Sequence, residues 1–282
     1  EDEVMALIPA RTLNTVLFFS DRGKVYSSKA YRIPEASRTS RGLPIVNVLN
    51  IDPSEKITAI VPVADFKDAK FCTMVTQKGM IKRVDLSEFE SVRPSGLIAI
   101  NLKEDDRLGW VQLSSGKDEL IIITRNGYAL RFKENEVRPM NRPAMGVIGI
   151  RLREGDEVVV TDIIEKGGDL LTITEKGYGK RTDLAAYPSR SRATMGILTV
   201  DKNALDKIGH IAAARVVQTK GHLITVISAE GTVMRTSAET ISQYNRVAQG
   251  VSVMQMREDD VVVAIARFSA QELESQEEES EE

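Results

Sequence analysis

The stretch DLLTITEKGYGKRTDLAAYPSRSRATMGILTV, residues 169–200, decides the fold because its pattern recurs along the chain. An apolar run is followed by a turn that ends in glycine, a second run, a polar loop, another glycine and a short alternating strand. Short β-rich runs bounded by glycine-containing turns are typical of hairpins, and no stretch keeps a sustained 3.6-residue apolar period. The pattern therefore predicts an all-β chain.

Four further copies align to this stretch, at a spacing of 48 to 56 residues. The turn glycines are Gly23, Gly79, Gly127, Gly177 and Gly231, and the loop glycines are Gly42, Gly96, Gly146, Gly196 and Gly250. One further apolar run precedes each copy, so each unit offers about four strands. The five units span about residues 4–50, 57–102, 108–152, 158–200 and 211–256. Four-stranded units repeated at about fifty residues predict a propeller-like fold of five blades.

Two segments follow the fifth unit. The run VVVAIARF, residues 261–268, resembles the leading runs but has no hairpin after it, so we interpret it as an orphan strand that completes the first unit. Residues 269–282 are too acidic and too poor in apolar groups to fold, so a disordered tail is expected. We therefore predict a single domain over residues 1–268.

Composition narrows the class of protein. The chain has 282 residues, 42% of them hydrophobic, and no window approaches eighteen consecutive apolar residues, so neither a membrane span nor a secretory signal is expected. Cys72, the single cysteine, is expected to be a buried structural thiol in a reducing cytoplasm. The last twelve residues carry seven of the acidic groups, so the net charge of −3 becomes +4 for residues 1–270. The body of the chain is mildly basic.

Positive charge recurs at two offsets in the repeat. Four residues after the turn glycine stand Arg83, Arg131, Arg181 and Arg235, preceded in two copies by Lys82 and Lys180, whereas the first copy has Ser27 there, with Lys24 and Arg32 nearby. Near the loop glycine stand Arg38, Arg41, Arg93, Arg142, Arg190, Arg192 and Arg246.

These basic residues are our candidate DNA-binding set. A belt of cations repeated in each blade suits a duplex bent over it, because neutralised phosphates give affinity that does not depend on sequence. In the alternative interpretation, each arginine braces the carbonyl group of a loop. The loop glycine has two interpretations as well: it lets backbone approach a phosphate closely, or it marks the start of a strand.

Signatures of an enzyme are absent from the sequence. The segment GYGKRT, residues 177–182, has Thr174 where a phosphate-binding loop needs glycine. His210 and His222 have no partners at metal-ligand spacing. We therefore expect no catalytic residue, no metal site and no cofactor in this chain.

Several long phrases carry a family resemblance: SDRGKVY (20–26), ASRTSRGLPIVNVL (36–49), ITEKGYGKRT (173–182), YPSRSRATMGI (187–197) and VRPMNRPAMGVIGIRL (137–152). They closely resemble the C-terminal domain of bacterial DNA gyrase A, part of a type IIA topoisomerase. The resemblance implies a β-pinwheel of six blades whose basic perimeter wraps duplex DNA. It also implies that the remainder of gyrase A and the ATPase partner, gyrase B, cooperate with this domain in ATP-dependent negative supercoiling. ATP and Mg²⁺ would act elsewhere in the holoenzyme, which is expected in the cytoplasm at the nucleoid.

One departure and two alternatives accompany this resemblance. The family's Q-R-R-G-G-K-G box is missing, since SRTSRGLP (37–44) lacks the paired glycines, so the chain is expected to hold five of six blades. Topoisomerase IV has a related C-terminal domain and is the first alternative. The second is a propeller that serves as a protein-interaction scaffold; it predicts recurring Gly-Gly or Trp-Asp pairs, of which the chain has a single Gly-Gly and no Trp-Asp.

Overall fold

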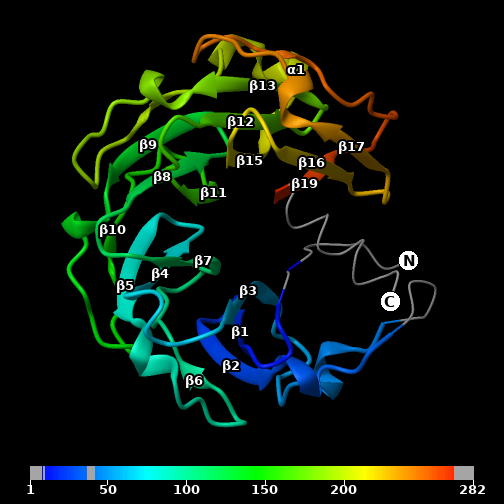
Figure 1. Ribbon diagram of the computed structural model, residues 1–282. Helices are drawn as coiled ribbons and strands as arrows, with labels where there is room; N and C mark the ends of the chain where they lie inside the picture. The colour runs from blue at the N-terminus through cyan, green and yellow to red at the C-terminus, as the bar shows by residue number, and fades with distance from the viewer. Residues whose placement is uncertain (1–7, 9, 37–41, 270–282) are drawn as a thin grey trace. The chain divides into compact units, whose positions relative to one another are not determined.

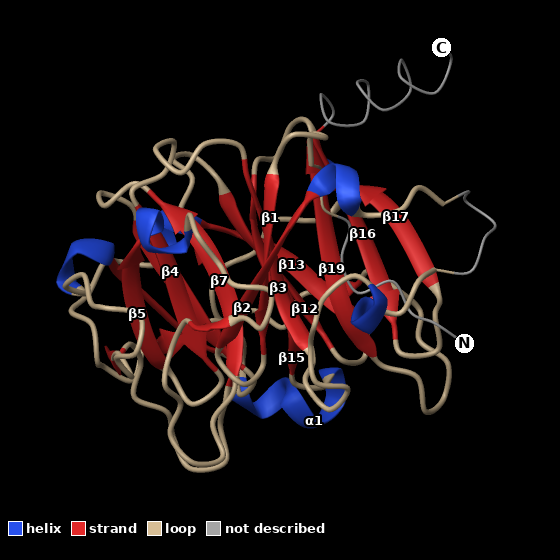
Figure 2. Cartoon of the chain, turned by 90° about the horizontal axis from the view of Figure 1, so that it is seen from below, coloured by secondary structure: helices blue, strands red, loops and turns tan. Residues whose placement is uncertain are grey.

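The computed structural model describes residues 8, 10–36 and 42–269, and its regular structure is nearly all β (Figure 2). The strands form four four-stranded sheets and one three-stranded sheet, and all neighbouring strands run antiparallel. Among the described residues, helical structure is limited to short 3₁₀ turns and α1 (Leu205–Ile208). The prediction of an all-β chain built from repeated hairpins is confirmed.

The five sheets follow one plan (Figure 1). The first has the order β3 (Ile57–Val63), β1 (Thr15–Ser20), β2 (Lys24–Lys29) and β6 (Leu97–Ile98). The second has β7 (Leu108–Ser114), β4 (Phe71–Thr76), β5 (Met80–Asp85) and β10 (Val147–Ile148). The third has β11 (Val158–Ile163), β8 (Glu119–Thr124), β9 (Tyr128–Lys133) and β14 (Ile197–Leu198). The fourth has β15 (Ile211–Val217), β12 (Asp169–Thr174), β13 (Tyr178–Asp183) and β18 (Val251–Ser252). The fifth has β19 (Val262–Ser269), β16 (His222–Ser228) and β17 (Val233–Ser237).

The sheets are assembled across the boundaries of the sequence repeats. A hairpin such as β1–β2 forms the middle of each four-stranded sheet, and the apolar run of the next repeat, here β3, pairs with its first strand. The short strand after the loop glycine of the next repeat, here β6 after Gly96, pairs with the second strand of the hairpin. The sequence repeat groups each leading run with the hairpin that follows it, but the structure pairs the run with the hairpin before it. Each leading run has one hairpin before it and one after it in the chain. The repeated sequence therefore cannot show with which of the two hairpins the run pairs.

The same rule corrects the interpretation of residues 261–268 as an orphan strand. This run forms β19, which pairs along the whole of β16, from His222 opposite Ser269 to Ser228 opposite Val262. It is the closing strand of the fifth sheet, equivalent to β3 in the first.

The chain divides into two compact units, which are described separately. Residues 8–118 with 134–149 hold the first two sheets, and residues 119–133 with those from 150 onward hold the other three. In the first unit, Leu17, Phe19 and Met74 share a core in which the rings of Phe19 and Phe89 meet edge to face at 5.8 Å. Burying such side chains is the main source of stability. The single domain over residues 1–268 stays a prediction.

Two other expectations concern single residues and a membrane. Cys72 is fully buried on β4, as expected, and this burial raises the pKa of its thiol. Within the described residues, no helix has the length and apolar character needed to cross a membrane.

Three of the loop glycines, Gly146, Gly196 and Gly250, serve the close approach of backbone to backbone. Gly146 has a φ of +86°, and a Cβ atom there would lie 2.5 Å from the carbonyl oxygen of Ile81 on β5. Gly250 has a φ of +81°, with the same distance to the carbonyl oxygen of Gly179 on β13. Only glycine fits, because a side chain would meet both the strained φ and the neighbouring strand. At these positions glycine marks the start of the fourth strand. This is the second of our two interpretations of the loop glycine, the first being close approach of the backbone to a phosphate.

Candidate nucleic-acid interface

Two of the predicted DNA-binding lysines lie inside the protein. Lys82 on β5 and Lys180 on β13 are 0% and 2% exposed. The Nζ atom of Lys82 donates to the carbonyl oxygens of Ala99, at 2.7 Å, and Arg142. Burial lowers the pKa of both ammonium groups to about 8. These lysines hold the polar loops of the next repeat in place.

The arginine that follows each lysine is a second brace. Arg83 donates from Nε to the carbonyl oxygen of Val137 at 2.6 Å, and Arg181 donates in the same way to Ile241 at 2.7 Å. On β9 the corresponding Arg131 is half-buried and donates to the carbonyl oxygen of Leu184 at 3.1 Å.

A carboxylate completes each arginine brace. Glu134 lies 3.6 Å from Nη1 of Arg83, Glu119 pairs with Arg131, and Asp169 pairs with Arg181. Desolvation alone would raise the pKa of Glu119, but hydrogen bonds from Arg131 and Ser189 outweigh it, so this pKa is lowered. A buried guanidinium is satisfied when carbonyl and carboxylate oxygens both accept from it.

The belt interpretation is wrong for five of the six basic residues at the first offset in the repeat. Lys82, Arg83, Arg131, Lys180 and Arg181 are turned into the fold, where desolvated cations require partners. In these three repeats the arginine holds the loop of the following repeat, whereas Arg235 in the fifth is exposed. Bracing of a loop carbonyl, the alternative we had kept open, is what the structure shows.

The remaining predicted positions are divided between surface and ion pairs. Arg32, Arg93, Arg190 and Arg235 are exposed, and Arg142, Arg192 and Arg246 are half-buried. Lys24 pairs with the buried Glu55 at 3.0 Å, and Arg142 lies 3.4 Å from Glu88. Arg38 and Arg41 lie outside the described residues.

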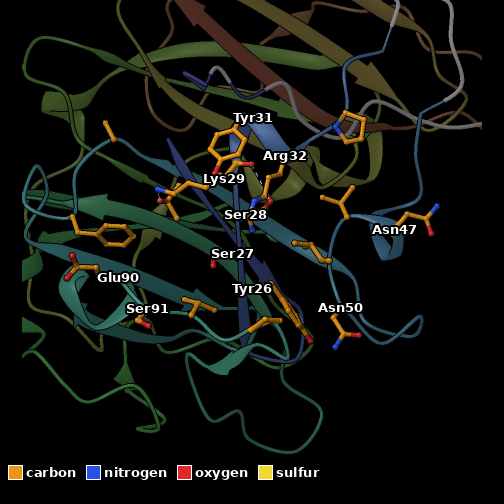
Figure 3. A pocket seen from close by; sticks show the side chains of 18 of the residues that line it. Tyr26, Ser27, Ser28, Lys29, Tyr31, Arg32, Asn47, Asn50, Glu90 and Ser91 are labelled. Atoms are coloured by element: carbon orange, nitrogen blue, oxygen red, sulfur yellow. Dashed lines mark hydrogen bonds between the residues drawn. The ribbon is translucent and has the colours of Figure 1, made fainter. Parts of the chain in front are cut away.

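The first sheet departs from the plan because Ser27 stands where the brace would be. A pocket of about 1030 Å³ opens beside Ser27 and Ser28 on β2, and its wall includes Arg32, Glu90 and Asn50 (Figure 3). In the second, third and fourth repeats the arginine at this position is bridged by a loop segment, as Arg83 is by Pro139. The structure thus brings Arg32 to a polar hollow whose lining carries both signs of charge.

The loops before the fourth strands share a feature that our sequence analysis missed. Five stretches contain no acidic residue, in a chain with 41 acidic residues among 282. These acid-free loops are residues 36–51, 91–103, 137–153, 184–200 and 240–257, one in each repeat, and every one contains arginine. Counting acids separately from bases would have revealed them.

Exposed arginines without an ion pair occupy four of the acid-free loops. Arg93, Arg138, Arg190 and Arg257 are exposed, and none of them forms an ion pair with another described residue. Arg138 was absent from our predicted set, because it lies at neither of the two repeated offsets. A surface with guanidinium groups and no carboxylates favours polyanions such as nucleic acid. Among the described residues no cluster of side chains is suited to hold a metal ion.

Comparisons with known proteins agree with the repeat. The family described as "DNA gyrase C-terminal domain, beta-propeller" matches residues 14–64, 72–113, 118–164, 168–218 and 222–269. DNA gyrase A of Halalkalibacterium halodurans is 46% identical over 99% of this chain and 33% of its own length. DNA gyrase A of Clostridium acetobutylicum is 42% identical over 100% of this chain and 34% of its own length. The chain thus spans about a third of the length of these relatives.

Solved structures share the architecture. The C-terminal domain of DNA topoisomerase IV superposes with a TM-score of 0.84 at 28% identity, over 96% of this chain and 84% of that one. The DNA gyrase A C-terminal domain gives a TM-score of 0.80 at 24% identity, over 94% and 90% of the two chains, which is a likeness of fold. With five matched segments that together cover most of its length, the chain belongs to the DNA gyrase C-terminal domain family.

Proposed function

We propose that this chain binds duplex DNA through its acid-free loops, as the C-terminal part of a DNA gyrase A protein. The observation that supports the proposal most is the separation of charge. Carboxylates are excluded from one loop in every repeat, although the whole chain has more acidic than basic groups. Phosphate contacts of this kind give affinity that does not depend on base sequence and falls steeply with salt.

Repetition of the loops extends the proposal from binding to bending. Contacts distributed over several repeats can offset the elastic cost of a bent duplex, which is on the order of a few kcal/mol for a short site. In the parent protein, DNA wrapped in this way would be presented to the cleavage machinery for ATP-dependent negative supercoiling. No catalytic role is assigned to this chain, and the remainder of gyrase A and the ATPase partner supply the chemistry in the cytoplasm.

Topoisomerase IV is the second candidate for the parent enzyme, on the strength of the structural match at a TM-score of 0.84. The gyrase assignment is favoured because the gyrase relatives are 42% and 46% identical to nearly the whole chain, whereas the topoisomerase IV domain is 28% identical. A relaxed plasmid separates the two candidates when the parent enzyme is assayed. Gyrase introduces negative supercoils with ATP, and an enzyme that only relaxes or decatenates DNA would require the other assignment.

Binding itself is tested with the chain as it stands. A labelled duplex is titrated over a salt series with the whole chain and with a form that ends at Ala270. We expect measurable affinity at low salt that declines linearly on logarithmic axes as salt rises, and tighter binding by the form without the acidic tail. Absence of binding by both forms at low salt would overturn the proposal.

A further inference from the structure

Each acid-free loop exposes a large apolar side chain. The five are Leu43, Ile98, Met145, Met195 and Val247. Single exposed apolar residues are common on protein surfaces, and of these five only Met145 and Met195 share a position, directly before the loop glycine. These two methionines raise the question of which apolar surface they meet within a basic loop.

The loop that presents Met195 is anchored by three hydrogen bonds from the preceding repeat. Arg151 donates from Nε to the carbonyl oxygen of Ala193 at 2.8 Å, and its backbone N–H donates to the carbonyl oxygen of Thr194 at 2.9 Å. Arg153 donates from Nη1 to the carbonyl oxygen of Met195 itself, also at 2.8 Å. The guanidinium of Arg153 is fixed in turn, since it stacks 3.4 Å from the centroid of the Tyr128 ring.

The backbone of this loop is also strained. Ala193 has a φ of +62°, one of three positive values found for non-glycine residues in the described part of the chain. Such a conformation is disfavoured for a residue with a Cβ atom and persists where the surroundings enforce it. The result is a rigid apolar tip, Met195, which is 44% exposed and lies between Arg192 and the loop glycine.

The preceding repeat supplies an internal comparison. Met145 stands at the same offset and is 46% exposed, but Asn101 and Lys103 occupy the places of Arg151 and Arg153. The corresponding backbone bond, from Asn101 to the carbonyl oxygen of Ala144, is 3.4 Å long. Met145 thus has the same side chain and nearly the same exposure without the two guanidinium braces.

Resting on the proposed DNA binding, we propose that Met195 is a wedge that enters the minor groove of the bound duplex and opens a base step there. Apolar side chains, methionine among them, kink DNA in this way, and arginine is drawn to a narrow minor groove. Unstacking a base step costs free energy, so the wedge must be delivered by a backbone that does not yield. The braces from Arg151 and Arg153 meet this requirement, and Met145 lacks them.

The test compares Met195→Ala with Met145→Ala on a set of duplexes, which carry a fluorophore pair at their ends and 2-aminopurine at successive steps, because binding that does not depend on base sequence has no fixed register. We expect the parent chain to bring the ends together and to brighten 2-aminopurine summed over the set. Met195→Ala should lose both signals, while its affinity stays within about threefold of the parent because phosphate contacts dominate. Met145→Ala should keep both signals, and Met195→Leu should restore them.

Met195→Gln keeps the length of the side chain and removes the apolar tip, so it must fail in the same way as the alanine variant. Thermal unfolding of each variant shows that the fold is intact. Bending and brightening that persist in Met195→Ala, with binding intact, would overturn the wedge and leave the proposed function standing. A parent chain that does not bind the duplex would overturn both.

Discussion

The Nζ atom of Lys180 donates a hydrogen bond of 2.9 Å to the carbonyl oxygen of Asn245, which belongs to the next repeat. Lys82 makes the equivalent contact with the carbonyl oxygen of Arg142. Each lysine thus crosses from a hairpin to the loop that we assign to DNA binding. The loops are consequently positioned by buried charge, and their geometry depends on groups that DNA does not touch.

These buried ammonium groups make stability depend on pH. Their pKa of about 8 in the folded chain lies below the ordinary value of 10.5. Between these two values the unfolded chain binds more protons than the folded one, so the free energy of unfolding rises with pH there and is flat below pH 8 in this respect. We expect a gain on the order of 1–3 kcal/mol per lysine from pH 8 to pH 10. Urea unfolding of the parent and of Lys82→Met plus Lys180→Met measures it, and equal pH slopes for the two would contradict the assignment.

Removal of a buried arginine should be costly. Arg181→Met leaves Asp169 buried without its cation and leaves the carbonyl oxygen of Ile241 without its donor, so we expect a loss of about 3–5 kcal/mol. Arg235→Met is the matched control: the residue has the same offset in the repeat but is exposed on β17, so its loss should lie within about 0.5 kcal/mol. Similar losses for both variants would return Arg181 to a surface role.

The loop glycine gives a test of close approach. Gly146→Ala would place a methyl group 2.5 Å from the carbonyl oxygen of Ile81, in addition to the positive φ. Gly155 also has a positive φ, of +71°, but no atom lies within 4 Å of the position of its Cβ. We expect Gly155→Ala to cost about 1 kcal/mol and Gly146→Ala at least twice that. Denaturant midpoints measure the difference, and equal costs would show that β10 does not start against β5.

The sequence predicts much of the fold because each hairpin is a local structure. Glycines at fixed offsets and alternating apolar runs define strands such as β12 and β13, which lie close together in the chain. The pairing of β3 with β1, or of β19 with β16, is not local, and a repeated sequence offers each run two equivalent neighbours. Register across repeats therefore had to come from the structure.

The candidate site was predictable only in part, for a related reason. A periodic arginine shows that the repeat requires a cation at that position. The period does not show whether the cation binds partners inside the protein or a ligand at the surface. Arg83 and Arg181 keep their residue type because of partners inside the protein, whereas the exposed Arg138 follows no period. The absence of acids in the loops is the better sequence signal, since it reflects the field that a bound polyanion would experience.

The salt dependence of duplex binding tests the central claim most directly. The parent is compared with a triple variant in which Arg93, Arg138 and Arg190 are changed to Gln, and with a control in which the exposed Lys166, Lys207 and Lys220, outside the acid-free loops, are changed to Gln. Each lost phosphate contact lowers the slope of log affinity against log salt by about 0.9. We predict a slope shallower by about two to three for the loop variant and an unchanged slope for the control. An unchanged slope for the loop variant, or an equal loss in the control, would contradict the claim that the acid-free loops bind DNA.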